Sequence, residues 1–434
     1  MAKKSTMVLN LLVLTSLGFL AAGCNDVDGK KPTVSTKEAS KLEEQGKNAE
    51  AADMYSRIGE ILLSKPEGII HAQEMFKKSL KLDPNDAKAN IYSSLLNPVL
   101  TSKGFLTRFS AQLEKNGNVD VAAEKEKLAK MNVKEFTEFA LTMPSGKTAA
   151  KNYEDVRKFI REDFVQELDA SIKMLDNVKA ERTVLSYLDL SSSKAAPTSS
   201  ATSAVITSSD APKSWDEAAI EREVEHASTV ANKEYVVDNY DIKALKIILK
   251  THKNALTIAT SIGLSGVEEV VAKIKSTSAK TDKQIIAAIK SQPQFLNIEA
   301  SKEELTTIFD HTEEVMNDMI DFSKISKEVC GTDARKANLA SNICVSEAAA
   351  DKINELLMFV VGPKSVLLGY DANNEEVLVE VNLRGLVYTR VFSFQELLPT
   401  KFDSNGKAVD VADQTFGGII PNGDLISKLK TVVK

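Results

Sequence analysis

The sequence has few aromatic residues and no block of basic residues, and each shortage argues against a class of protein. Aromatic residues make up 6% of the 434 residues, with a single Trp, which favours helices packed through Ala, Leu and Ile over an aromatic-rich β-sandwich. The 55 basic and 61 acidic residues give a net charge of −6 and are spread along the chain. Because no basic run could neutralise phosphates, nucleic-acid binding is not expected.

Sequence signatures of catalysis are also missing. The chain has neither a Gly-x-Ser-x-Gly elbow nor a Gly-x4-Gly-Lys-Ser/Thr phosphate loop. Glu223 and His226 have the Glu-x-x-His spacing of di-iron helical bundles, but the four histidines form no second such pair. We therefore expect no metal, no cofactor and no enzymatic activity. A hydrolase whose catalytic groups meet only in three dimensions remains an alternative.

The first 24 residues have the pattern of an export signal. Lys3 and Lys4 form a positive start, the run from Met7 to Leu20 is apolar apart from one Asn, and "LAAG" provides small residues for cleavage. The apolar run of 14 residues is short for a membrane-spanning helix, which needs about 20.

The stretch "LAAGC" resembles the bacterial lipoprotein signal, in which a cysteine after small residues is lipidated and becomes the new N-terminus. The resemblance implies a signal peptide over residues 1–23, a lipid on Cys24 and a polar tether over 24–35. It also implies a location in the cell envelope. Asn25, in place of the Asp that retains such proteins in the inner membrane of enteric bacteria, favours the outer membrane, with the side of the membrane left open. An ordinary secretory signal cleaved near Ala22 is the alternative.

Lipidation of Cys24 would leave Cys330 and Cys344 as a pair in an exported protein, where disulfides persist. Thirteen mostly polar residues separate them, and closing a loop of this size stabilises by about 3 kcal/mol in the chain-entropy model. A metal site is the alternative, but no histidine lies near either cysteine in the sequence. We therefore expect a disulfide.

Residues 36–100 have helical patterns with two repeat-like stretches, "EQGKNAEAADMYSRI" and "HAQEMFKKSLKLDPND". Their small residues, their aromatic residue and the proline that ends the second stretch resemble a tetratricopeptide (TPR) repeat. Tyr55 and Phe76 are 21 residues apart, whereas the repeat period is 34, so we expect one degenerate repeat with flanking helices. An ordinary helical hairpin is the alternative. The resemblance makes four residues candidates for a partner-binding groove: Tyr55, His71, Met75 and Tyr92.

The rest of the chain is expected to be mainly helical. Residues 101–190 form a helical region, the Ser/Thr/Ala-rich stretch 191–213 is a linker or long loop, and 214–434 form a larger helical body. Helices are expected near 215–235, 241–262, 266–276, 282–291, 302–322 and 345–360. Near the C-terminus "VLVEVNLRGLVYTRVF" alternates, which predicts a small β-hairpin turning at Gly385. "DANNEE" and "DSNGKAVDVAD" resemble calcium loops in part, and turn chemistry is the preferred explanation of both.

Together these features predict a mainly α-helical, lipid-anchored envelope protein that acts as a protein-interaction scaffold through its TPR-like helices. Its expected partners are the membrane, through the lipid, and another envelope protein. The alternative is an accessory lipoprotein that holds a small-molecule ligand in a pocket between helices.

Overall fold

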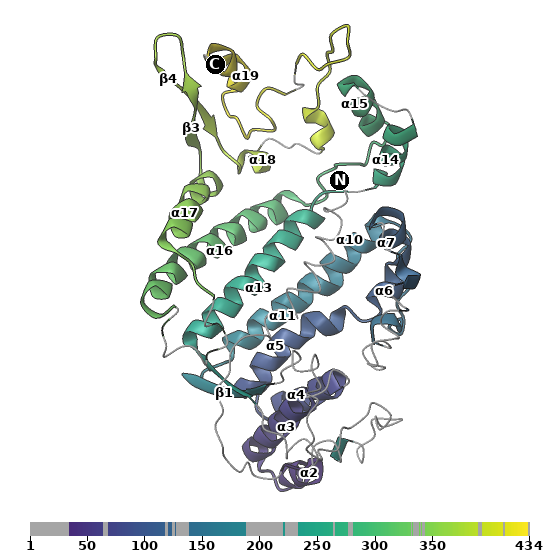
Figure 1. Ribbon diagram of the computed structural model, residues 1–434, viewed down its shortest axis with the longest axis vertical. Helices are drawn as coiled ribbons and strands as arrows, with labels where there is room; N and C mark the ends of the chain where they lie inside the picture. Colours follow the sequence, from purple (N-terminus) through teal and green to yellow (C-terminus); the bar gives the residue numbers. More distant parts are fainter. Residues whose placement is uncertain are drawn as a thin grey trace, which may run out of the picture. The chain divides into compact units, whose positions relative to one another are not determined.

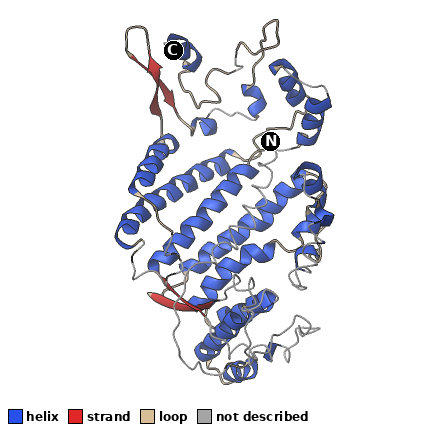
Figure 2. Cartoon of the chain, in the orientation of Figure 1, coloured by secondary structure: helices blue, strands red, loops and turns tan. Residues whose placement is uncertain are grey.

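The computed structural model describes residues 34–63, 68–117, 120–123, 126, 139–187, 220–221, 233–263, 265–276, 281–330, 332, 338, 340, 343–388, 393–410 and 413–432. These residues are mainly α-helical and include two small antiparallel β-hairpins, one of them near the C-terminus (Figure 2). The fold class expected from the sequence is therefore confirmed.

The chain forms two compact units that are interleaved in the sequence. Unit 1 comprises residues 1–151, 166–249 and 329–344, and unit 2 comprises 152–165, 250–328 and 345–434. This division does not follow the boundaries expected from composition. The stretch 191–213 lies outside the described residues, and the elements on both sides of it belong to unit 1, so it does not separate the two units.

The front of unit 1 is a series of helices in which each one packs against its neighbour in the sequence (Figure 1). These helices are α2 (Thr36–Glu44), α3 (Asn48–Leu62), α4 (Ile69–Leu82) and α5 (Ala87–Thr101). Unit 1 also contains α6 (Phe105–Arg108), α7 (Ser110–Gly117) and most of α11 (Val165–Asp176). Along α5 the residues from Ala89 to Ser94 are all buried, so this helix is central to the core of the unit.

Local sequence explains where these helices begin. The Ser35 hydroxyl accepts a hydrogen bond from the Glu38 N–H at the start of α2, and the Asp86 carboxylate accepts one from the Ala89 N–H at the start of α5. Both are short polar side chains of the kind that satisfy the free N–H groups of a first turn. Gly46, at φ +72°, adopts the left-handed conformation that the turn from α2 to α3 requires.

A β-hairpin in unit 1 corrects two helical assignments. β1 (Arg182–Tyr187) pairs antiparallel with β2 (Lys233–Asp238), in the register Val184 opposite Val236. Residues 182–187 were expected to end a helical region and residues 233–235 to end a helix. The β-branched and aromatic residues of "RTVLSY" and "KEYVVD" favour a half-buried extended chain, and pairing between these distant strands outweighs the helical periodicity.

Unit 2 contains the remaining helices. They are α10 (Tyr153–Lys158), which continues through a π-helical turn (Phe159–Phe164), and α14 (Val267–Ser276), α15 (Asp282–Lys290), α16 (Lys302–Val329), α17 (Glu347–Val361), α18 (Gly385–Tyr388) and α19 (Leu425–Thr431). Of these, α14, α15, α16 and α17 lie close to the positions expected from the sequence. α13 (Asn239–Thr260) belongs to unit 1 up to Leu249 and to unit 2 beyond it. At the start of α15, Thr281 and Gln284 have the spacing of a capping box, and both of its reciprocal hydrogen bonds are present.

The C-terminal hairpin uses a different partner strand from the one expected. β4 (Glu376–Val381) pairs with β3 (Lys364–Tyr370), which precedes it, while Gly385 begins the short helix α18. The turn is made at Asp371, whose carboxylate accepts the N–H groups of Asn373 and Glu375. This Asx-type turn, rather than Gly385, reverses the chain.

Arg384 fixes the segment after β4 within unit 2. Its guanidinium donates to the Val360 carbonyl at 2.8 Å and forms ion pairs with Asp310 and Glu313, each at 2.9 Å. The side chain is 18% exposed, so these bonds are partly shielded from water. One side chain therefore ties the C-terminal segment to both α16 and α17. No helix in the described part of the chain is long and apolar enough to cross a membrane.

Candidate functional site in the front helices of unit 1

Three of the four candidate groove residues lie in the core of unit 1. Tyr55 on α3, Met75 on α4 and Tyr92 on α5 are 1%, 3% and 5% exposed. They therefore do not line a groove that a partner could enter, which corrects the expectation. Apolar and aromatic residues at helical spacing mark the face turned toward the neighbouring helix, and this pattern is the same for a core and for a groove.

His71, the fourth candidate, lies on α4 and keeps part of its side chain in contact with solvent. Its side chain is 18% exposed, and its Nδ1 atom lies 3.5 Å from the carboxylate of Glu74, one turn further along the helix. Of the four candidates, His71 alone lies outside the buried core of unit 1.

Tyr55 connects three helices through its ring and its hydroxyl. The hydroxyl donates to the Glu43 carboxylate at 3.1 Å and lies 3.2 Å from the Ser40 hydroxyl, both on α2. Lys78 of α4 places its ammonium 5.2 Å from the centre of the ring, within range of a cation–π contact. The residue is therefore a junction of α2, α3 and α4 rather than a binding residue.

The close approach of α3 and α4 depends on Gly59, which the sequence analysis did not identify as a site residue. A Cβ atom at this position would overlap the ring of Phe76 on α4. The same ring stacks on Tyr92 of α5, with the ring centres 5.0 Å apart and the planes 10° from parallel. A glycine, a phenylalanine and a tyrosine thus fix the spacing of three successive helices.

Polar groups between the helices are bonded to one another. The Glu60 carboxylate of α3 forms an ion pair with Lys88 at 2.9 Å and accepts a hydrogen bond from the Tyr92 hydroxyl at 3.3 Å, both on α5. The side chain of Glu60 is 3% exposed. Apolar packing alone would allow α3 and α5 to slide past each other. The buried charge of Glu60 fixes their alignment, because a shift of either helix would leave this charge unpaired.

A second polar contact lies where α4 leads into α5. The Ser56 hydroxyl of α3 donates to the Ser79 hydroxyl of α4 at 3.0 Å, and both hydroxyls lie close enough to the Asp86 carboxylate to stabilise its charged form. Burial raises the pKa of the Asp86 carboxyl above its ordinary value, against the lowering by the Ala89 N–H and the two hydroxyls.

The start of α2 binds a carboxylate from a distant part of the chain. Glu221 accepts hydrogen bonds from the Thr36 N–H at 2.8 Å, from the Thr36 hydroxyl and from the Ser35 hydroxyl. Burial disfavours the charged carboxylate, but these bonds and nearby Lys37 together hold the pKa of Glu221 below its ordinary value. Ile220, next to it, is 7% exposed and belongs to the apolar core. Sequence alone gave no signal for this contact, which joins positions 185 residues apart.

Asp241, at the start of α13, is fully buried. Its carboxylate accepts hydrogen bonds from the Asp238 N–H, the Asn338 side chain and the Ala340 N–H, each at 2.9 Å. Burial raises the pKa of Asp241, while these donors oppose the shift. The carboxylate holds Asn338 and Ala340 in place.

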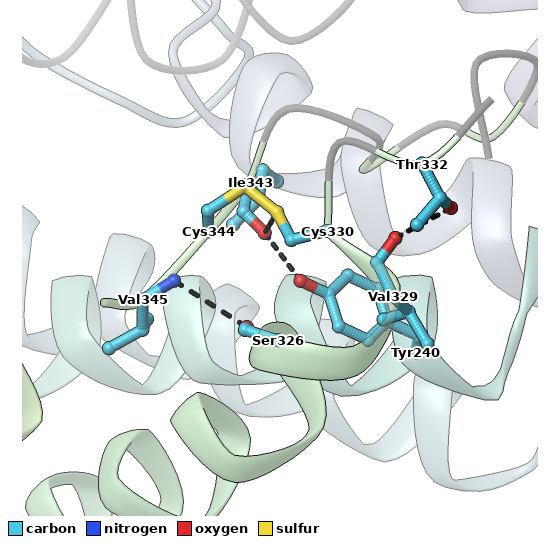
Figure 3. The surroundings of a disulfide bond; sticks show 8 residues. All are labelled: Tyr240, Ser326, Val329, Cys330, Thr332, Ile343, Cys344 and Val345. Carbon is cyan, nitrogen blue, oxygen red and sulfur yellow. Dashed lines mark hydrogen bonds between the residues drawn. A yellow bond between two sulfur atoms is a disulfide. The ribbon is translucent and has the colours of Figure 1, made fainter. Parts of the chain in front are cut away.

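The same segment is closed by Cys330 and Cys344, which the structure joins in a disulfide with their Cα atoms 5.9 Å apart (Figure 3). Tyr240 points its hydroxyl at the Ile343 carbonyl next to the disulfide and donates to it at 2.7 Å. The cysteine pair expected from the sequence is therefore the pair that the structure brings together. It lies at the two ends of segment 329–344, which the chain contributes to unit 1.

Aspartates of both calcium-like loops accept backbone N–H groups: Asp371 of "DANNEE" does so at the turn between β3 and β4, and two aspartates of "DSNGKAVDVAD" do the same. Asp403 accepts the N–H groups of Asn405 and Lys407, and Asp410 accepts those of Thr400 and Lys401. Among the described residues, no group of three or more His, Cys, Asp or Glu side chains is placed to hold a metal ion. Cys24, Glu223 and His226 lie outside the described residues.

Comparison of the chain with protein-family models, with curated proteins and with solved structures finds no match.

Proposed function

We propose that this protein is a lipid-anchored component of the bacterial cell envelope that binds another envelope protein through the helices α2–α5. The observation that supports this most is the serial packing of these helices, each against its neighbour in the sequence. Arrays of this kind offer an extended outer surface for proteins while their inner faces form the core. Cys24 in its lipoprotein-like context and the cysteine pair of an exported protein support the envelope location.

The exposed face of α4 indicates the chemistry of the partner. Glu74, Lys77, Lys78 and Lys81 are exposed and lie at helical spacing on one side of this helix. Three lysines against one glutamate make that face basic, and electrostatic complementarity then favours an acidic partner surface. The chain as a whole is acidic, so this local reversal of charge supports a binding role for the face.

The lipid anchor is tested by fractionation of the full chain in a Gram-negative host. The wild-type chain should sediment with the outer membrane and carry the mass of an acylated cysteine, whereas Cys24→Ala should be recovered in the soluble periplasmic fraction. Cys344→Ala serves as the matched control, because it removes a cysteine and leaves the signal intact. Full membrane association of Cys24→Ala would refute the anchor.

Partner binding is tested by crosslinking in the native envelope. The wild-type chain should give a defined crosslinked species, and the charge reversal Lys77→Glu, Lys78→Glu and Lys81→Glu should weaken it at least about tenfold. A control with three exposed lysines outside α4 reversed, such as Lys173, Lys302 and Lys324, should retain it. An equal loss in both variants would show that α4 is not the binding face.

A further inference from the structure

The exposed apolar side chains of the described residues are concentrated in one short stretch of unit 2. Of the eleven that are large and exposed, six lie between positions 356 and 378: Leu356, Met358, Val361, Leu367, Tyr370 and Leu378. They come from the end of α17 and from the hairpin of β3 and β4. Lys364 joins these two elements, because it donates to the Glu355 carbonyl at 3.4 Å and lies over the Phe359 ring. Exposed apolar side chains gathered in this way mark an interaction surface.

The hairpin has apolar side chains on both faces, and α19 packs against it (Figure 1). Val379, on one face, is 2% exposed, and a Cβ atom on Gly369 would meet the side chain of Val432 at the end of α19. On the opposite face Leu367 and Leu378 lie directly across from each other and are 45% and 39% exposed. One face of the hairpin is therefore in the core of unit 2, while the other presents leucines to the solvent.

β4 is an edge strand with one unpaired side. Within the described residues it pairs with β3 alone, and the backbone of 376–381 forms no hydrogen bond on its other side. β3 is also an edge strand, but its register shifts between Leu367 and Gly369, which interrupts a regular ladder. A regular edge strand such as β4 presents a row of N–H and C=O groups to which a further strand can bond.

Two glutamates lie on either side of Leu378 on the exposed face of β4. Because side chains alternate between the faces of a strand, Glu376, Leu378 and Glu380 share one face. Neither glutamate forms an ion pair within the described part of the chain. An added strand places one side chain opposite each of these three, where opposite charges and apolar pairs stabilise the sheet. The edge therefore matches a strand in which basic, apolar and basic side chains share one face.

Charge argues against two other occupants of this edge. If a second copy paired antiparallel through β4, with Leu378 opposite its counterpart, Glu376 would face Glu380 of the other copy. Like charges directly opposite each other destabilise a sheet. At a membrane surface the same glutamates would meet anionic lipid headgroups, which repel them. A basic strand from another protein satisfies the backbone, the leucine and both charges together.

We therefore infer that the outer edge of β4 binds an extended segment of a partner protein, in which lysine or arginine lies two residues before and two residues after an apolar residue. The segment adds a third strand to the hairpin, with its basic side chains opposite Glu376 and Glu380 and its apolar side chain beside Leu378. This surface is distinct from the basic face of α4 and selects the opposite charge. The inference goes beyond the proposed function, because binding here does not require binding at α4.

The test uses two designed fluorescent peptides, "TKTVTKT" and "TETVTET", and the full chain purified in detergent. The wild-type chain should bind the lysine peptide about tenfold more tightly than the glutamate peptide. The double variant Glu376→Lys, Glu380→Lys should reverse this preference, which a misfolded variant cannot do. The matched control Glu269→Lys, Glu328→Lys changes two exposed glutamates of α14 and α16 and should keep the wild-type preference.

Hydrogen exchange and backbone methylation test whether the peptide binds as a strand. The β4 amides should exchange about fivefold more slowly with the lysine peptide, and the α4 amides should not change. N-methylation along the peptide should weaken binding at every second position, because alternate N–H groups of a strand point toward its neighbour. Leu378→Thr should weaken binding about threefold, whereas Val409→Thr, at another exposed valine, should have no effect.

Three results would overturn the inference. The first is equal binding of the two peptides, or a double variant that keeps its circular dichroism and does not reverse the preference. The second is protection of the β4 amides without peptide in a chain that sediments as a dimer, which would assign the edge to a second copy. The third is protection by lipid vesicles and not by the peptide, which would assign it to a membrane. Each leaves the binding role of α4 to its own crosslinking test.

Discussion

Replacing Gly59 by alanine should destabilise unit 1, although alanine is the better helix former. On its own, alanine in place of glycine inside a helix stabilises by about 1 kcal/mol. The new methyl group, however, would lie 2.7 and 2.8 Å from two ring atoms of Phe76, and that ring is also stacked on Tyr92 of α5. Forcing a methyl into a filled core costs about 1–3 kcal/mol, so we expect a net loss of about 1 kcal/mol.

The assay is hydrogen exchange of the α3 and α4 amides, which reports the local free energy of opening in unit 1. Phe76→Leu provides the control background, because it removes the ring that the methyl would meet. In that background Gly59→Ala should stabilise by about 1 kcal/mol, so the sign of its effect reverses. If Gly59→Ala stabilises equally in both backgrounds, the argument that this glycine sets the helix spacing is wrong.

Three further predictions follow from single contacts. Asp86→Asn keeps the cap of α5 and removes a buried charge. In the wild type the pKa of Asp86 in the folded state lies above its ordinary value of 3.8. The carboxyl therefore contributes to stability below pH 3.8, and this contribution is lost as the pH rises through the folded-state pKa. The variant should therefore gain stability over the wild type as the pH rises through that window, and a constant difference in urea unfolding from about pH 3 to about pH 7 would contradict this. Arg384→Lys should destabilise unit 2 by about 1–3 kcal/mol, because lysine lacks the planar set of N–H donors with which Arg384 bonds two carboxylates and a carbonyl. The control Lys324→Ala removes an exposed ion pair and should change the unfolding free energy by less than about 0.5 kcal/mol. Similar thermal shifts in the two variants would show that Arg384 does not hold the C-terminal segment in place. Changing Cys330 and Cys344 to serine should cost roughly 3 kcal/mol, and a melting transition of unit 1 that does not respond to reductant would show that the disulfide does not constrain it.

Local patterns predicted the helices well because capping and periodicity are properties of neighbouring residues. The helix expected over 241–262 is α13 at 239–260, and the capping box at Thr281 is present. The strands were harder, since β1 and β2 are stabilised by pairing across a long connection. The C-terminal hairpin was expected, but its partner strand was placed after β4 because Gly385 gave a stronger turn signal than Asp371.

The candidate site was less predictable, because most of its contacts join distant positions. Tyr55, Met75 and Tyr92 were selected for residue type and spacing, which do not distinguish a residue facing a partner from one facing the next helix. Glu221 was not selected at all, since no local pattern shows that a glutamate bonds a helix start 185 residues away. The cysteine pair was identified correctly because only two cysteines remained once Cys24 was assigned to the lipid.

The division of unit 1 into three stretches of sequence affects the order in which the chain can fold. The helices α2–α5 can pack as they are synthesised, because each meets its sequence neighbour. Asp241 must wait for Asn338 and Ala340, which follow 97 and 99 residues later. A fragment ending before residue 329 would leave this buried carboxylate with only one of its three donors. Unit 1 is therefore completed late in synthesis, and oxidation of Cys330 and Cys344 is the step that closes it.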